Sequence, residues 1–160
     1  MATRLIHILP ADYRLWDASL GPNATLAHAA AVFGILPSDF DRWELADDDG
    51  VTVAHMAALH GAMPKGFDKW ELANVNGVTV AHVAAESGHL PDDFNQWHLA
   101  DNDGNTVAHA FVGHIFESKK LLKKIPWAGD RNVWCLVNNY GMSVESLFRK
   151  LREATMVSDI

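Results

Sequence analysis

The stretch DDDGVTVAHMAALHGA, residues 47–62, recurs as NVNGVTVAHVAAESGH (74–89) and again, at the same step, as DNDGNTVAHAFVGHIF (101–116). A segment that returns at a fixed step of about 27 residues is the signature of a stacked-repeat protein. Because one such unit cannot cover its own apolar face, neighbouring units must pack side by side to make a continuous core. The repeat therefore predicts an elongated chain of similar layers.

Five further sets of residues keep the same step along the chain. They are Trp16, Trp43, Trp70 and Trp97; His28, His55, His82 and His109; Thr25, Thr52, Thr79 and Thr106; Pro10, Pro37, Pro64 and Pro91; and the aromatic set Tyr13, Phe40, Phe67 and Phe94. The period thus extends back to the start of the chain and gives four units, over residues 9–35, 36–62, 63–89 and 90–116.

The second unit shows the local structure expected of each. Residues 47–50 read as a turn, because aspartate side chains accept hydrogen bonds from nearby amides and Gly50 tolerates a positive φ. Thr52 follows as the helix N-cap, and a helix is predicted over 53–60, ended by Gly61.

A second, shorter helix is predicted over residues 63–70, with Pro64 in its first turn, where proline is tolerated. It carries Phe67 and Trp70. Each tryptophan can bury about 150–250 Å², so the sequence predicts that these side chains fill the space between layers.

The repeated segment resembles the ankyrin-repeat motif, D-x-x-G-x-T-P-L-H-x-A-A-x-x-G-H. The residues that match are Gly50, Thr52, His55, Ala57, Ala58 and Gly61, and again Gly77, Thr79, His82, Ala84, Ala85 and Gly88. The resemblance covers about residues 9–116. The chain departs from the family in its shorter step, since ankyrin repeats return after about 33 residues. It also reads T-V-A-H for T-P-L-H.

These features predict an all-α, ankyrin-like helical repeat solenoid with short second helices and helical caps at both ends. We expect one repeat domain over 1–160, with residues 1–8 as the N-terminal cap. Residues 117–160 are expected to form a helix (117–124) and a degenerate fifth unit (133–151), in which Ser146 replaces the repeated histidine.

The charge of the chain is uneven. The net charge is −7, but residues 1–116 hold five basic against fifteen acidic side chains, whereas residues 117–160 hold eight against five. An acidic body disfavours nucleic acid, which requires cations to neutralise phosphates, and favours a protein partner with a basic surface. No stretch is long and apolar enough to span a membrane. The single cysteine, Cys135, favours a reducing compartment, either the cytoplasm or a host cytosol into which the protein is delivered.

No motif predicts catalysis, a metal or a cofactor. The resemblance implies that the periodic histidines are structural and bond backbone groups within and between repeats. Calcium is disfavoured for the aspartate-rich turns, since Leu99 and Ala110 stand where an EF-hand loop would need carboxylates. Cys135 is expected to be buried rather than nucleophilic.

The resemblance implies a non-enzymatic scaffold, a monomer by default, that binds a protein partner through its turn tips and concave helix face. The residues that vary between units at those places are Asp48, Asp49, Val51, Leu59, His60, Val75, Asn76, Val78, Glu86, Ser87, Asn102, Asp103, Asn105, Gly113 and His114. One alternative remains open: a dedicated inhibitor, of the toxin-immunity or anti-defence type, that blocks a basic protein site with its acidic face.

Overall fold

The computed structural model describes residues 15–21, 24–118 and 125–157. Its helices are α2 (Leu26–Val32), α3 (Val53–Leu59), α4 (Val80–Ser87), α5 (Val107–Glu117), α6 (Arg131–Trp134) and α7 (Val144–Val157). Two short strands, β1 (Ser19–Gly21) and β2 (Ala24–Thr25), pair antiparallel in the first unit. The chain is therefore mostly helical, as predicted.

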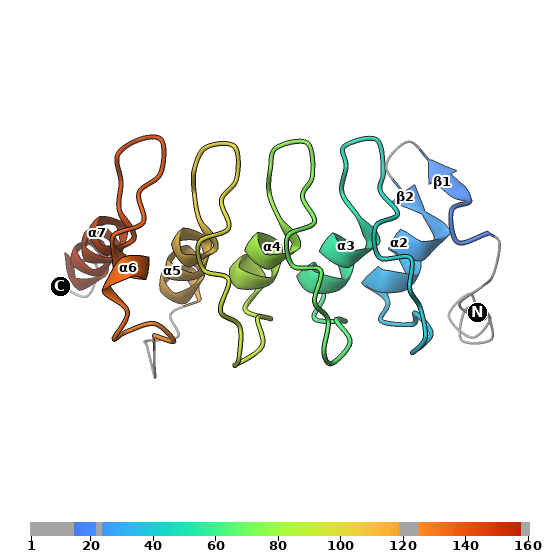
Figure 1. Cartoon of the computed structure of the whole chain (residues 1–160), viewed down its shortest axis with the longest axis horizontal. Coiled ribbons are helices and arrows are strands. Elements are labelled where there is room, and N and C mark those ends of the chain that lie inside the picture. The colour runs from blue at the N-terminus through green and yellow to red at the C-terminus, as the bar shows by residue number, and fades with distance from the viewer. Residues whose placement is uncertain (1–14, 22–23, 119–124, 158–160) are drawn as a thin grey trace.

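The helices α2, α3, α4, α5 and α7 form a single row in which each contacts the next (Figure 1). Long loops extend from one edge of this row, and shorter loops extend from the opposite edge. The helical repeat solenoid expected from the sequence period is confirmed.

Each repeat helix begins at the predicted threonine. In the second unit the side chain of Thr52 accepts a hydrogen bond from the His55 amide, and the His55 ring accepts one from the Thr52 amide, which closes a capping box with histidine in the place of the usual glutamate. Further along the same helix, Ala57 and Ala58 are fully buried. Small residues here allow the neighbouring helix to approach closely.

In the second, third and fourth units the second helix is replaced by turns. In the third unit, Phe67 donates its amide to the Pro64 carbonyl at 3.2 Å and Leu72 donates to Lys69 at 3.4 Å, so two reverse turns replace the helix expected over 63–70. Gly66 has a φ of +82°. This left-handed conformation stops helix propagation after one turn.

The turn segment is attached directly to the following helix. The amides of Val80 and Ala81, which have no partner within α4, donate to the carbonyls of Leu72 and Trp70 at 2.9 and 3.1 Å. The extended path of this segment brings Trp70 against the helix row, where its side chain is only 7 % exposed.

The buried aromatic side chains form a continuous ladder along the solenoid. Its edge-to-face steps run through Trp16, Phe40, Trp43, Phe67, Trp70, Phe94 and Trp97, with ring centroids 4.9–5.6 Å apart. Such pairs add about 0.5–1.5 kcal/mol each beyond the area that they bury. The prediction that tryptophans fill the space between layers is confirmed.

The C-terminal residues repeat the layout of the preceding units. Val137 and Ser143 form an isolated β-bridge, equivalent to the bridge between Ala46 and Thr52 in the second unit. Helix α7 begins directly after Ser143. The hydroxyl of Ser143 donates to that of Ser146, 2.9 Å away, where the other units have threonine and histidine. The N-terminal cap (1–8) lies outside the described residues, as does most of the helix expected over 117–124; α5 ends at Glu117.

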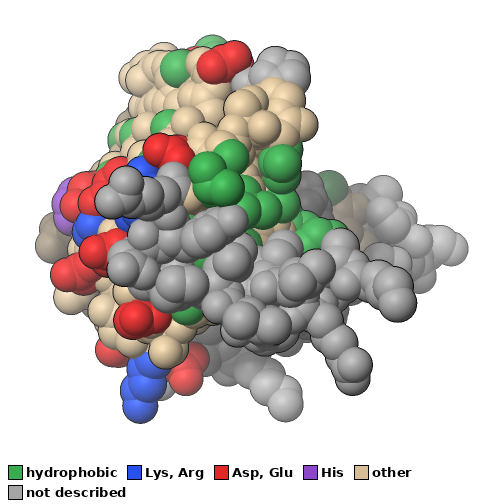
Figure 2. Space-filling view, turned by 90° about the vertical axis from the view of Figure 1, so that its right-hand side faces the viewer, with side chains coloured by type: hydrophobic (Ala, Val, Ile, Leu, Met, Phe, Trp, Pro, Cys, Tyr) green, Lys and Arg blue, Asp and Glu red, His purple; other side chains and the backbone are tan. Residues whose placement is uncertain are grey.

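Figure 2 views the solenoid from its N-terminal end. Acidic side chains are spread over the flank, and apolar side chains gather in the middle of this end. Leu15 and Leu20, in the first described unit, are 52 % and 59 % exposed.

Candidate functional site

The four periodic histidines connect neighbouring units. The Nε2 atoms of His28, His55, His82 and His109 lie 2.9–3.1 Å from the carbonyl oxygens of Val51, Val78, Asn105 and Met142. Each of these carbonyls belongs to the next unit. The expectation that these histidines bond backbone groups within and between repeats is confirmed.

The partners of each ring determine its tautomer. In His82, Nε2 faces a carbonyl and must carry the hydrogen, whereas Nδ1 accepts hydrogen bonds from the amide and hydroxyl of Thr79 at 3.2 and 2.7 Å. Burial lowers the pKa of His55, His82 and His109, and this effect outweighs the hydrogen bond from each ring to a carbonyl, which raises it. Both nitrogens are therefore occupied in a neutral ring and are unsuited to proton transfer or metal binding.

The long loops, which we call the fingers, comprise residues 47–51, 74–78, 101–105 and 138–142. The first residue of each finger is an aspartate or asparagine, and its side-chain oxygen accepts hydrogen bonds from two backbone amides of the same loop. In the third finger Asp101 Oδ1 accepts from Asp103 and Asn105, at 3.0 and 2.8 Å. The carboxylates that resemble calcium ligands are thus used to shape the turns.

Adjacent fingers are joined by backbone hydrogen bonds. The amides of Val75, Asn102 and Asn139 donate to the carbonyls of Asp49, Asn76 and Asp103 in the preceding finger, at 2.9–3.1 Å. The side-chain amide of Asn102 adds a bond to the Val75 carbonyl at 3.1 Å. The fingers therefore form a ladder that holds their tips in fixed register.

Thirteen of the fifteen predicted binding residues fall into three groups. The side chains of Asp48, Asp49, Val75, Asn76, Asn102 and Asp103 are exposed at the finger tips. Those of Leu59, His60 and Glu86 are exposed at the C-terminal ends of α3 and α4, where Ser87 is half-buried. Val51, Val78 and Asn105 lie at the bases of the fingers, half-buried, and their carbonyls hold the histidines.

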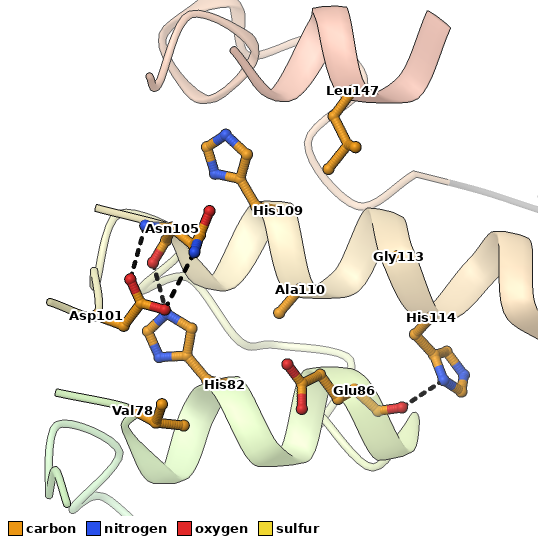
Figure 3. A pocket seen from close by; sticks show the side chains of 10 residues that line it. All are labelled: Val78, His82, Glu86, Asp101, Asn105, His109, Ala110, Gly113, His114 and Leu147. Carbon is orange, nitrogen blue, oxygen red and sulfur yellow. Dashed lines mark hydrogen bonds between the residues drawn. The ribbon is translucent and has the colours of Figure 1, made fainter. Parts of the chain in front are cut away.

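A groove of about 480 Å³ lies between α4, α5 and the third finger (Figure 3). It brings together five of the variable positions, Val78, Glu86, Asn105, Gly113 and His114. Its other lining residues, which sequence reasoning did not assign to a binding surface, are His82, Asp101, His109, Ala110 and Leu147. The two histidines belong to the periodic set, but the role of Leu147 could not be found, because α7 falls outside the exact repeat.

One predicted binding residue also has a packing role. His114 Nδ1 lies 2.7 Å from the carbonyl oxygen of Glu86 near the end of α4, and His89 Nδ1 lies 3.0 Å from that of Ala58 near the end of α3. A histidine N–H can donate a hydrogen bond to a carbonyl in the last turn of a helix. Part of each imidazole is therefore committed to joining two layers.

The last finger carries a side chain that the sequence did not single out. Tyr140 is 73 % exposed at its tip and donates its hydroxyl to Asp103 Oδ1 at 3.1 Å. This bond raises the pKa of the Tyr140 phenol, since the hydroxyl loses its acceptor if it ionises.

Cys135, at the C-terminal end of α6 just before this finger, is exposed, so the expectation that it is buried is wrong. The core of the fifth unit is filled without it, by Val133 and Val144.

Within residues 15–21, 24–118 and 125–157, no cluster of three or more histidine, cysteine, aspartate or glutamate side chains is arranged to hold a metal ion. Over the same residues, no helix has the length and apolar character to cross a bilayer.

No protein-family model matches the chain, and no curated protein shows significant sequence similarity to it.

Proposed function

We propose that the chain is a non-enzymatic scaffold, built from shortened ankyrin-type repeats, that binds a protein partner through the finger tips and the groove. The observation that carries this proposal is the contrast between framework and tips. The framework residues and their hydrogen bonds repeat from finger to finger, whereas the exposed side chains change from Asp48 and Asp49 to Val75 and Asn76, and then to Asn102 and Asp103.

The rigidity of the fingers supports a binding role. A surface whose backbone is already fixed loses little conformational freedom when a partner binds, which leaves more of the contact energy for affinity. The tips also offer an aromatic side chain, Tyr140, beside the acidic Asp103. Tyrosine is among the residues that contribute most to protein interfaces.

The acidic tips favour a partner with a basic surface. Asp48, Asp49 and Asp103 are exposed on the second and fourth units, and no lysine or arginine occurs in the first three fingers. The same observation favours the second candidate function, an inhibitor that covers a basic active site. The chain has a single cysteine and so can form no internal disulfide, which favours a reducing compartment such as the cytoplasm for either function.

Affinity capture with the full chain, followed by mass spectrometry, tests this proposal in two steps. The first identifies proteins retained by the wild-type chain. The second compares Asp48→Lys/Asp103→Lys with Asp39→Lys/Asp92→Lys, an equal charge change at exposed aspartates outside the fingers. We expect the finger variant alone to lose the partner, with a melting temperature close to that of the wild type.

Salt dependence then separates the two candidates. An affinity that falls steeply between low and physiological salt indicates an electrostatic plug on a basic site, whereas a weak dependence indicates apolar docking. Equal retention of the partner by both variants would contradict binding through the fingers.

A further inference from the structure

A second cavity, distinct from the groove, lies at the C-terminal end of the solenoid. It is an open depression of about 490 Å³ between α6 and α7. Four of its lining residues, Glu145, Phe148, Arg149 and Arg152, follow the spacing of one helical face of α7. Arg131 and Trp134 of α6 line the opposite side. We call this cavity the C-terminal pocket.

The floor of the C-terminal pocket is aromatic and ordered. The rings of Trp134 and Phe148 meet edge to face, with centroids 5.5 Å apart. Trp134 also contacts Trp127, and its indole N–H points to the Ala128 carbonyl at 3.4 Å. The two rings are half-buried, so each still presents apolar surface to the cavity.

The rim of the pocket is basic and incompletely neutralised. Three guanidinium groups face a single carboxylate, that of Glu145, and Arg149 takes that partner at 3.1 Å. Neither Arg131 nor Arg152 forms an ion pair with any residue in the described part of the chain. Both side chains are exposed. The pocket therefore carries a local excess of positive charge on a protein whose net charge is −7.

We propose that the C-terminal pocket binds an acidic segment of a protein partner. Arginine presents a planar fork of donors that pairs with a carboxylate through two hydrogen bonds. Tryptophan and arginine are also the residues most enriched among those that dominate protein interfaces. Arg131 and Arg152 hold carboxylate side chains of the segment, and the Trp134 and Phe148 rings receive an apolar side chain between them.

A long polyanion fits this surface less well than a short acidic segment. The pocket has the size of a small-ligand site, and the body that precedes it holds fifteen acidic side chains over residues 1–116. A nucleic acid that extended beyond the pocket would run against that charge. An acidic protein segment can end where the pocket ends.

This site does not depend on the function proposed for the fingers. Its lining residues differ from those of the fingers and the groove, it takes a ligand of the opposite charge, and it is tested by a different variant. Loss of finger binding would leave the pocket intact, and the reverse also holds.

Fluorescence anisotropy of labelled peptides on the full chain tests the pocket. The probe is a ten-residue peptide of glutamate with two central phenylalanines, and its matched control replaces every glutamate with glutamine. We expect the glutamate peptide to bind at least about tenfold more tightly than its control, and Arg152→Glu to remove about tenfold of that affinity. Lys150→Glu makes the same charge change on the same helix, outside the pocket lining, and should cost less than about twofold.

Several results would overturn the proposal. Equal losses in Arg152→Glu and Lys150→Glu would show a net-charge effect without a site, and equal binding of the two peptides would exclude carboxylate recognition. Tighter binding of inorganic phosphate or of a single-stranded oligonucleotide would assign the pocket to phosphate. Salt-sensitive self-association in sedimentation would assign it to the acidic loops of a second copy. Should Arg152→Glu unfold, Arg131→Gln, also exposed, repeats the test.

Discussion

The imidazole of His55 belongs to one repeat and bonds the next: its Nε2 lies 3.0 Å from the carbonyl oxygen of Val78, while its Nδ1 holds the amide of Thr52 in its own unit. One buried side chain therefore caps the helix that it belongs to and fixes the distance to the following finger. Because His28, His82 and His109 make the same pair of contacts, the spacing of the solenoid is set at four successive junctions.

Replacement of a bridging histidine should destabilise the protein. His82→Ala removes the acceptor for the Thr79 amide, which is buried, and the donor for the Asn105 carbonyl, which is partly buried. We expect a loss of about 2–4 kcal/mol, since buried groups left unpaired cost about 1–3 kcal/mol each. Urea denaturation measures this loss. His60→Ala, at the exposed C-cap of α3, is the control and should change stability by less than about 0.5 kcal/mol.

Stability should fall as the pH is lowered below about 6.5. In the unfolded chain a histidine titrates near 6.5, but burial lowers the pKa of His55, His82 and His109 in the folded state. The unfolded chain therefore binds more protons in the window between the two values. The stabilisation is fully present above the unfolded pKa and is lost as the pH falls toward the folded pKa.

The slope of this loss follows from proton linkage. Each histidine contributes up to about 1.4 kcal/mol per pH unit, so three together give up to about 4 kcal/mol per pH unit. Urea midpoints at pH 7.5, 6.5 and 5.5 provide the measurement. A free energy of unfolding that rose on acidification over this range would contradict the neutral, buried state of the three rings.

The aromatic ladder should make the central tryptophan costly to remove. Trp70 is 7 % exposed and contacts Phe67 and Phe94, with centroids 5.1 and 5.6 Å away. We expect Trp70→Ala to cost about 3–5 kcal/mol, because a large cavity opens in the middle of the stack. Thermal melting checks this, with Val75→Ala, 64 % exposed on a finger, as a substitution that should be nearly silent. An unchanged melting temperature in Trp70→Ala would refute the stacked architecture.

Glycine in the fingers should be required for the approach of the next finger as well as for its backbone conformation. Gly77 has a φ of +74°, and a Cβ there would lie 2.7 Å from the Asn102 amide nitrogen. Gly66 has a φ of +82° but no neighbour within 4 Å of such a Cβ among the described residues. We expect about 1 kcal/mol for Gly66→Ala and about 2–4 kcal/mol for Gly77→Ala, measured by urea denaturation. Equal costs would mean that the finger ladder does not depend on close contact.

The first residue of each finger should need an oxygen acceptor rather than a charge. Asp101 Oδ1 accepts the amides of Asp103 and Asn105, and Asn74 does the same for Asn76 and Val78 in the preceding finger. Asp101→Asn should therefore be nearly neutral, whereas Asp101→Ala should cost about 1–2 kcal/mol. Comparison of the two melting temperatures tests this, and a large loss in the asparagine variant would indicate a role for the charge itself.

Much of the architecture could be read from the chain because the signals are local and repeated. Thr52, His55 and Gly61 mark the start and end of one helix, and their recurrence at a constant step fixes the next. The fifth unit could be recognised although Ser146 replaces the histidine. The second helix could not be judged in this way, because Pro64 and Phe67 suit both a short helix and a pair of turns.

The candidate site was only partly accessible to sequence reasoning. Variation between units pointed to the finger tips, where Asp48 and Val75 are exposed. It did not separate side chains from backbone: Val51 varies between units, yet its carbonyl holds His28. Nor did it reveal the C-terminal pocket, whose Arg131 and Arg152 come from two helices that meet only in the folded fifth unit.

The sequence by itself determined the period, the number of layers and the residues that cap and bury each helix, because these depend on contacts within one unit and on the same contact made again. The tertiary structure alone decided that Trp70 enters the core from a turn rather than a helix, that the Asn102 amide joins its finger to the one before, and that the groove forms beside Leu147. Each of these depends on the distance between layers, and that distance exists only once the units have packed against one another.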